Sequence, residues 1–182
     1  MAYKTIFEEL NEKSRGETQS RTWYRNEIFK NYQQDPSKLI REDQFDEADN
    51  LLKRDNNVVR SFPKLFSLMF YQYKAKTRRD LPFYDKYPLT FILDIQPKYF
   101  FGVNLHYYSP EERMGIVSGL AKNKIPKFQK GAHKYLYSEL RSPLLDLAEK
   151  EWQTICLVPI EEFVRDLGGV EIPIPSTKVW GR

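Results

Sequence analysis

Four basic residues recur at helical spacing between Lys127 and Arg141. Lys127, Lys134 and Arg141 are seven positions apart, and Lys130 follows Lys127 by three. A helix from Pro126 through Leu140 would place them on one face, opposite an apolar stripe of Ile125, Phe128, Ala132, Tyr135 and Leu136. A helix with one basic face can lie along a phosphate backbone. The spacing therefore predicts a nucleic-acid-binding helix, with an ordinary amphipathic helix and a solvated lysine face as the alternative.

A second basic run lies upstream, between Lys74 and Arg79. It contains Arg78 and Arg79 and follows Tyr71 and Tyr73 closely in sequence. Cations interleaved with aromatic side chains can bind nucleic-acid strands by charge and by stacking. We therefore expect Arg78 and Arg79 to assist the phosphate contacts. A solvated loop whose tyrosines belong to the core is an equally good interpretation.

A metal-dependent nuclease would need clustered carboxylates, usually with a lysine nearby. Asp85, Asp94 and Lys98 offer a faint version of the Asp…Glu-x-Lys arrangement of restriction-like nucleases, but the lysine is displaced by two positions. Pro97 also interrupts the strand that would align Asp94 with Lys98. A nuclease is therefore kept only as a second alternative, and we expect no catalytic residues.

Few residues are available for metal or cofactor chemistry. Cys156 is the only cysteine, and it sits in an apolar segment that favours a buried, inert thiol. His106 and His133 are the only histidines, and His106 is expected to have a structural role. The sequence has no phosphate-binding Gly-rich loop, no Gly-x-Ser-x-Gly and no His-Glu-x-x-His. We expect neither a cofactor nor a metal.

The charge of the chain is distributed unevenly. The formal net charge is only +4, with 29 basic and 25 acidic residues. Residues 60–86 carry seven basic and two acidic groups, and residues 113–141 carry seven and one, whereas the remaining blocks are net acidic. Such segregation favours a polyanionic partner, nucleic acid first. No apolar run approaches the length of a membrane span, so no membrane partner is expected.

The chain that positions these residues is long enough for one domain with an additional arm. Residues 1–59 are net acidic and indicate helices over 3–13, from Ser20 to Asn31, and within 36–54. We expect this helical arm to dock on another protein or on a second copy of the chain. Residues 60–182 are expected to form the core domain.

The core is expected to alternate strands and helices. Strands are predicted over 65–76, 89–95, 99–107, with Gly102 at a bulge, and 152–159, and helices from Ser109, from Pro126 and over 160–167. The first three strands suggest an antiparallel meander. The fold class is therefore α+β, with a helical N-terminal arm followed by a small antiparallel sheet or partly open barrel with packed helices.

One stretch carries a resemblance to known proteins. It runs from Tyr71-Gln72-Tyr73 through Leu81-Pro82-Phe83-Tyr84-Asp85 and Phe101-Gly102-Val103-Asn104 to Arg113. Trp23-Tyr24-Arg25 and Glu151-Trp152 are similar as well. Together these residues resemble a family of small proteins of large contractile-tailed bacteriophages, with the DNA end protectors as the first label and a head, neck or baseplate component as the other.

The resemblance implies a viral, non-enzymatic role linked to assembly. The expected function is binding of DNA, at the genome ends in particular, in the host cytoplasm during assembly and then in the virion. The alternative is a structural head, neck or baseplate protein that binds other virion proteins. A homo-oligomer is compatible with both. The resemblance transfers no catalytic residue, so the expected DNA contacts are Lys127, Lys130, Lys134, Arg141, Arg78 and Arg79.

Overall fold

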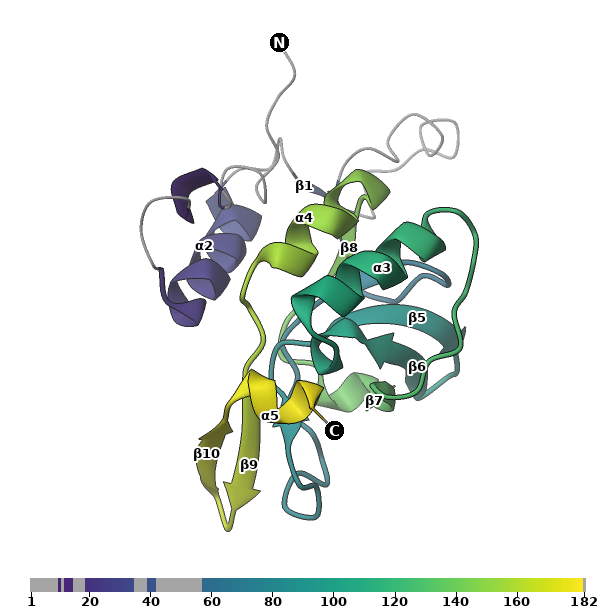
Figure 1. Ribbon diagram of the computed structural model, residues 1–182. Helices are drawn as coiled ribbons and strands as arrows, with labels where there is room; N and C mark the ends of the chain where they lie inside the picture. Colours follow the sequence, from purple (N-terminus) through teal and green to yellow (C-terminus); the bar gives the residue numbers. More distant parts are fainter. Residues whose placement is uncertain (1–9, 11, 15–18, 35–38, 42–56, 182) are drawn as a thin grey trace.

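The computed structural model describes residues 10, 12–14, 19–34, 39–41 and 57–181. Its main feature is an open seven-stranded sheet with helices on one face (Figure 1). The sheet contains β1 (Leu39–Arg41), β2 (Asn57–Arg60), β3 (Leu68–Phe70), β5 (Leu89–Ile95), β6 (Tyr99–Asn104), β7 (Ala132–Leu136) and β8 (Leu144–Leu147). A second sheet contains β4 (Tyr84–Asp85), β9 (Phe163–Leu167) and β10 (Val170–Ile174). The α+β class is confirmed, and neither sheet closes into a barrel.

The helices lie between and after the strands. They are α2 (Arg21–Gln34), α3 (Pro110–Leu120), α4 (Trp152–Leu157) and α5 (Ser176–Trp180), with 3-10 turns η3 (Leu105–Tyr107), η4 (Tyr137–Glu139) and η5 (Glu149–Glu151). Figure 1 shows α3 and α4 across the sheet and α2 beside α4. None of the helices in the described part of the chain has both the length and the apolar character that a membrane crossing requires.

The strand order explains how distant segments meet. In the large sheet the order is β1-β2-β8-β3-β5-β6-β7, with every neighbouring pair antiparallel except β1 and β2. The predicted meander is confirmed as β3, β5 and β6. The small sheet has the order β10-β9-β4, so β4 joins the C-terminal hairpin to the chain between β3 and β5.

Both faces of the large sheet are buried, because successive strand residues point to opposite sides. Leu68 and Phe70 face the helices and pack with Val117 of α3 and Ile155 of α4. Met69 faces the other way, into a second cluster rich in aromatic rings. That cluster contains Tyr71, Tyr73, Tyr84, Phe100 and Tyr135. Aromatic rings are therefore buried on both faces of the sheet, since the first cluster also contains Phe91 and Trp152.

Two predicted helix starts are confirmed with their caps. Ser109 Oγ accepts a hydrogen bond from Glu112 N at 3.3 Å, and Ser109 N donates to Glu112 Oε2 at 2.7 Å. This reciprocal pair is a capping box, and Pro110 occupies the first turn. At α2, Ser20 Oγ accepts from Trp23 N at 3.1 Å.

Gly102 lies at an irregularity of the sheet, as predicted. The register between β5 and β6 shifts between Ile92 and Asp94, so the extra residue is on β5, opposite Gly102. A Cβ atom on Gly102 would lie 2.5 Å from Thr90 Cγ2 and 2.6 Å from Phe91 O. The close approach of the two strands therefore requires glycine at this position.

The predicted basic helix over 126–140 is wrong. Residues 121–131 form an irregular connection, and residues 132–136 are strand β7. Gly131 has φ +80°, and a Cβ there would lie 2.6 Å from Asn104 O, so the chain turns sharply and then pairs with β6. Tyr135 buries its ring against Phe100, 5.4 Å between centroids. Pairing and burial on the sheet outweigh the helical spacing of the charges.

Two further predictions near the C-terminus are reversed. Residues 152–157 form helix α4 where a strand was expected, because Trp152, Ile155 and Cys156 lie on one helical face buried over the sheet. Residues 163–167 form strand β9 where a helix was expected, since the Gly168-Gly169 turn closes a hairpin with β10. Residues 170–174 form β10, the second strand of this hairpin.

The arm is described only in part. Most of the predicted helices over 3–13 and 36–54 lie outside the described residues, and within the second span residues 39–41 form strand β1 instead. α2 packs on the core: Tyr24 and Ile28 are buried with Leu105 and Val158. The division of the chain at residue 59 stays a prediction.

Candidate nucleic-acid interface

The structure distributes the six predicted DNA contacts over three places. Lys127 and Lys130 lie in the connection before β7, and Lys134 lies on β7. Arg141 follows η4, and Arg78 and Arg79 lie in the loop between β3 and β4. The four residues expected on one helix face therefore do not share a face.

Of these cations, those in the connection and on β7 already have partners among the described residues, except Lys127. Lys130 Nζ donates to Trp180 O at 2.7 Å, lies 5.1 Å from the centre of the Tyr108 ring and 4.0 Å from Glu112 Oε2. Lys134 Nζ lies 4.3 Å from the centre of the Tyr99 ring. Lys130 thus fastens the C-terminal helix to the core, whereas Lys127 is exposed.

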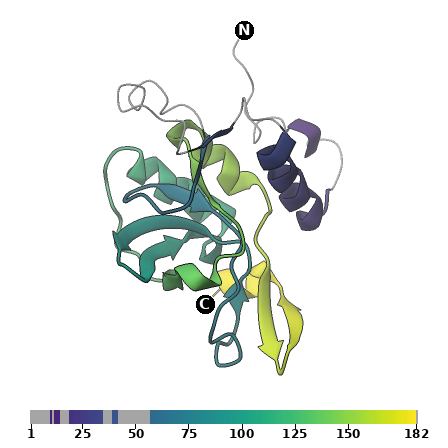
Figure 2. The same ribbon diagram turned by 180° about the vertical axis from the view of Figure 1, so that it is seen from behind.

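Arg78 and Arg141, far apart in sequence, line one groove. We call it the basic groove; its volume is about 520 Å³. Its walls are Gln72, Tyr73, Lys74, Arg78, Lys86, Arg141, Asp166, Gly169 and Glu171. The walls come from the loop after β3 and from the β9–β10 hairpin, which descend side by side from the sheet in both views (Figures 1 and 2). The pairing of β4 with β9 holds them together.

Ion pairs fix the groove's side chains. Arg78 Nε donates to Asp166 Oδ2 at 2.7 Å, and Lys86 Nζ donates to Glu171 Oε2 at 2.8 Å. Burial would lower the pKa of Lys86, but its hydrogen bond to Glu171 and the charges of Glu162 and Glu171 raise it above its usual value. Lys86 is therefore firmly charged, and both cations are held in defined positions.

The groove keeps an excess of positive charge. Four cations line it, Lys74, Lys86, Arg78 and Arg141, against the two carboxylates Asp166 and Glu171. Arg141 also pairs with Glu139 at 3.2 Å, outside the groove lining. Lys74 is exposed and forms no ion pair with any residue that the structure describes. The arrangement is therefore suited to an anion that can take hydrogen bonds from several cations at once.

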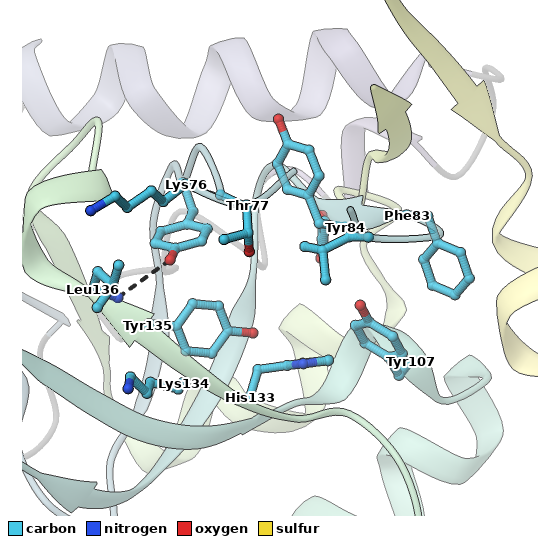
Figure 3. Close-up of a pocket in the computed structure, with 13 residues that line it drawn as sticks. Lys76, Thr77, Phe83, Tyr84, Tyr107, His133, Lys134, Tyr135 and Leu136 are labelled. Carbon is cyan, nitrogen blue, oxygen red and sulfur yellow. Dashed lines mark hydrogen bonds between the residues drawn. The ribbon is translucent and has the colours of Figure 1, made fainter. Parts of the chain in front are cut away.

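An aromatic pocket of about 400 Å³ lies beside the groove (Figure 3). It is lined by Tyr73, Ala75, Lys76, Thr77, Leu81, Phe83, Tyr84, Asp85, Tyr107, His133, Lys134, Tyr135 and Leu136. Tyr73 belongs to both walls, and its hydroxyl accepts a hydrogen bond from Leu136 N at 3.3 Å. The two hollows therefore share a wall.

Asp85 is part of a buried structural network, not of a metal site. Its Oδ2 lies 2.6 Å from His106 Nδ1 and accepts from Asn104 Nδ2 at 3.0 Å, while Oδ1 accepts from the backbone N–H groups of Tyr87 and Glu162. Burial would raise the pKa of Asp85, but His106 and these hydrogen bonds lower it. The predicted structural role of His106, which is fully buried, agrees with these contacts.

The carboxylates of the nuclease alternative do not meet. Asp94 is exposed near the far end of β5 and accepts a hydrogen bond from Gln96 at 2.8 Å, whereas Asp85 is buried on β4. Lys98 lies in the exposed turn after β5. No group of three or more potential metal ligands forms among the residues that the structure describes.

Sequence reasoning missed several residues of these sites. Lys86, Glu171 and Asp166 are brought to the groove only by the pairing of β4 with β9, which no local pattern reveals. His133 and Tyr107 are far apart in sequence, and no local pattern predicts that their rings lie 4.7 Å apart. The basic run from Lys74 to Arg79 was the one local signal for the groove.

A family model, described as phage T4 terminal DNA protecting protein, matches residues 21–130. The chain belongs to this family. No significant match was found among curated proteins or among solved structures. Membership in the terminal DNA protecting family confirms the resemblance to phage DNA end protectors and implies DNA as a partner in the context of phage infection.

The match of the terminal DNA protecting family begins with α2 and ends just before β7. It includes Lys74, Arg78 and Lys86 of the basic groove. Arg141 and the β9–β10 hairpin lie beyond it. The matched segment thus supplies one wall of the groove, and the segment that follows supplies the other.

Proposed function

We propose that this protein binds the ends of phage genomic DNA through the basic groove and shields them without catalysis. The single observation that carries the proposal is that Arg78 and Arg141 line one groove together with Lys74 and Lys86, in a chain of the terminal DNA protecting family. Phosphate groups accept hydrogen bonds from such clustered cations, and this contact depends on charge and not on base sequence.

The cations in and beside the groove differ in how firmly their side chains are held. Arg78 is held by Asp166 through Nε, which leaves its terminal guanidinium nitrogens for phosphate. Lys74 of the groove lining is exposed, and so is Arg79, whose Nη2 would lie 4.0 Å from a Cβ atom on Gly169 of that lining. Both side chains can follow a flexible DNA backbone. Lys127 and Lys134 remain candidates for phosphate contacts outside the groove, whereas Lys130 would have to give up the Trp180 carbonyl first.

Charge reversal tests this assignment. The double variant K74E/R79E should weaken binding to a hairpin duplex with one open end by roughly tenfold or more, and each lost phosphate contact should reduce the slope of log K against log salt by about 0.9. The affinity is measured by fluorescence anisotropy between 50 and 200 mM salt. Over this range, the affinity of a protein that makes six to ten phosphate contacts falls by a factor of about 10³–10⁵.

The matched control is K122E/K124E. It changes the net charge equally, but both lysines are exposed in the turn after α3 and neither lines the groove. Its effect should be much smaller than that of K74E/R79E. Equal losses for the two variants would mean that the overall charge, and not the groove, governs binding.

We further propose that the protein also contacts other virion proteins, during assembly in the host cytoplasm and in the particle. Large apolar side chains are exposed outside the groove lining: Phe62 is 63% exposed and Phe66 is 56% exposed. Phe66 has φ 58°, so the backbone holds this turn in a defined shape. Exposed apolar side chains in a defined turn favour a protein partner. Capture of the protein with purified particles, lost in F62S/F66S, would support this.

A further inference from the structure

We propose that the aromatic pocket receives one unpaired base of a DNA terminus while the adjacent basic groove holds the phosphates next to it. This inference rests on the proposed function and names the part of the DNA end that the protein recognises. A base in such a pocket would bind through its flat face and through the hydrogen-bonding groups on its edge.

The pocket presents several ring surfaces on one cavity. Figure 3 shows the rings of Tyr135, His133 and Tyr107 along one side and Phe83 near one end. Tyr107 lies 4.7 Å from His133 and 5.9 Å from Phe83 between ring centroids, and His133 lies 6.2 Å from Tyr135. Stacking on aromatic side chains is worth about 1–3 kcal/mol per base and tolerates any base. The cavity of about 400 Å³ is also in the size range of pockets for small ligands, about 300–1,000 Å³.

Two polar groups in the pocket lack partners among the described residues. His133 Nε2 is buried and makes no hydrogen bond. The Tyr107 hydroxyl also makes none, and Figure 3 shows it directed toward the interior of the pocket. Burial lowers the pKa of His133, so its imidazole is neutral near pH 7 and can donate or accept. Leaving the buried His133 Nε2 unpaired is unfavourable, so a ligand with donors and acceptors on its edge would satisfy it and could bind the Tyr107 hydroxyl as well.

The pocket and the groove are neighbours. Tyr73 lines both, and Lys76 and Thr77 of the pocket lining are exposed. Lys74 is two residues before Lys76 and lines the groove. A nucleotide whose base enters the pocket therefore has its phosphate next to cations, as single-strand-binding proteins combine stacking with a basic path for the backbone.

A pocket that holds one base would make the protein bind DNA ends in preference to internal duplex. A base within a duplex is paired and stacked on both sides, and extruding it costs a few kcal/mol, with the least cost for a base that is already unpaired. A terminal or overhanging base has one stacking neighbour at most, and it can reach the pocket without distortion of the duplex. The groove alone would bind phosphates anywhere along DNA, whereas the pocket is accessible only to a terminus.

The test compares three DNA molecules that differ only at the end. They are a hairpin duplex with a three-nucleotide single-stranded extension, the same hairpin with abasic residues in the extension, and a closed dumbbell with no end. The first two carry the same phosphates, so only the bases differ. We expect the wild-type protein to bind the base-bearing extension about tenfold more tightly than the abasic one, since about 1.4 kcal/mol of stacking corresponds to a factor of ten.

The protein side of the test uses H133L/Y107F. Tyr107→Phe removes a hydroxyl that has no partner, and His133→Leu replaces the ring by an apolar side chain of similar length, so both changes should preserve the fold. The single variant Y107F provides a milder second probe. The ratio between base-bearing and abasic DNA should fall below about threefold in the double variant, with an unchanged salt slope. F101L, on an exposed aromatic residue outside the pocket, should retain the full ratio.

The outcomes separate the two proposals. Equal affinity of the wild-type protein for base-bearing and abasic extensions, or a ratio unchanged in H133L/Y107F, would overturn the pocket assignment and leave phosphate binding through the groove intact. Equal affinity for open hairpins and the closed dumbbell would instead contradict the proposed function itself.

Discussion

Two glycines differ in how much space their neighbours leave for a side chain. At Gly102 a Cβ atom would lie 2.5 Å from Thr90 Cγ2, whereas at Gly115, in the middle of α3, nothing lies within 4 Å. Gly102→Ala should therefore lower the free energy of unfolding by about 1–3 kcal/mol through overpacking. Gly115→Ala should raise it by about 0.5–1 kcal/mol through helix propensity. Urea denaturation of both variants checks the pair, and a neutral Gly102→Ala would show that β5 can move away.

Glu161 is a buried carboxylate that links stability to pH. Burial would raise its pKa, but the charges of His106, Arg113 and Arg21 lower it to about 2. Because the folded pKa is below the unfolded value of about 4.3, Glu161 stabilises the fold above that pH. This stabilisation is lost as the pH falls from about 4.3 to about 2.

Glu161→Gln should remove that dependence. The variant leaves Arg113, only 1% exposed, without its carboxylate partner, so it should lose about 3–5 kcal/mol at pH 7. Its stability should then change less than that of the wild type between pH 4.5 and pH 2. Urea denaturation across this range measures both quantities. An identical pH profile for the two proteins would contradict the role of Glu161.

At the scale of elements, sequence reasoning succeeded where the signal is local. Ser109, Pro110 and Glu112 predicted the start of α3, and the strands predicted over 89–95 and 99–107 correspond to β5 and β6. It failed where pairing between strands far apart in sequence determines the local structure. The spacing of Lys127, Lys130 and Lys134 fits a helix, but the turn at Gly131 and the pairing of β7 with β6 place these lysines apart. The run from Lys74 to Arg79 indicated one wall of the groove, whereas the first strand of the hairpin that completes it, β9, was predicted as a helix.

The capping box provides an element-scale prediction. Ser109→Ala removes the side-chain acceptor for Glu112 N and should lower the free energy of unfolding by about 0.5–2 kcal/mol. Ser118→Ala, which lies inside the same helix, should be neutral or slightly stabilising because alanine is the better helix former. Thermal unfolding of the two variants gives the comparison. Equal effects would show that the cap contributes nothing specific.

At the scale of the whole molecule, contacts between α2 and the segment before β9 join the arm to the core. Arg25 of α2 pairs with Glu162 at 2.8 Å and donates to the carbonyls of Ile160 and Glu161, at the base of the β9–β10 hairpin. Deletion of residues 1–59 removes these contacts together with β2, so we expect a lower free energy of unfolding. Cooperative unfolding of the remainder would support an independent core domain. Loss of cooperativity would show that α2 belongs to the core.

The central claim, that this chain shields DNA ends through its basic groove, is tested most directly by protection from a purified double-strand exonuclease. Linear duplex should be degraded more slowly when the protein is present. K122E/K124E should protect as the wild type does, whereas K74E/R79E should protect poorly at the same concentration, with folding of each variant verified by circular dichroism. Unprotected DNA at saturating wild-type protein, or full protection by K74E/R79E, would contradict the account.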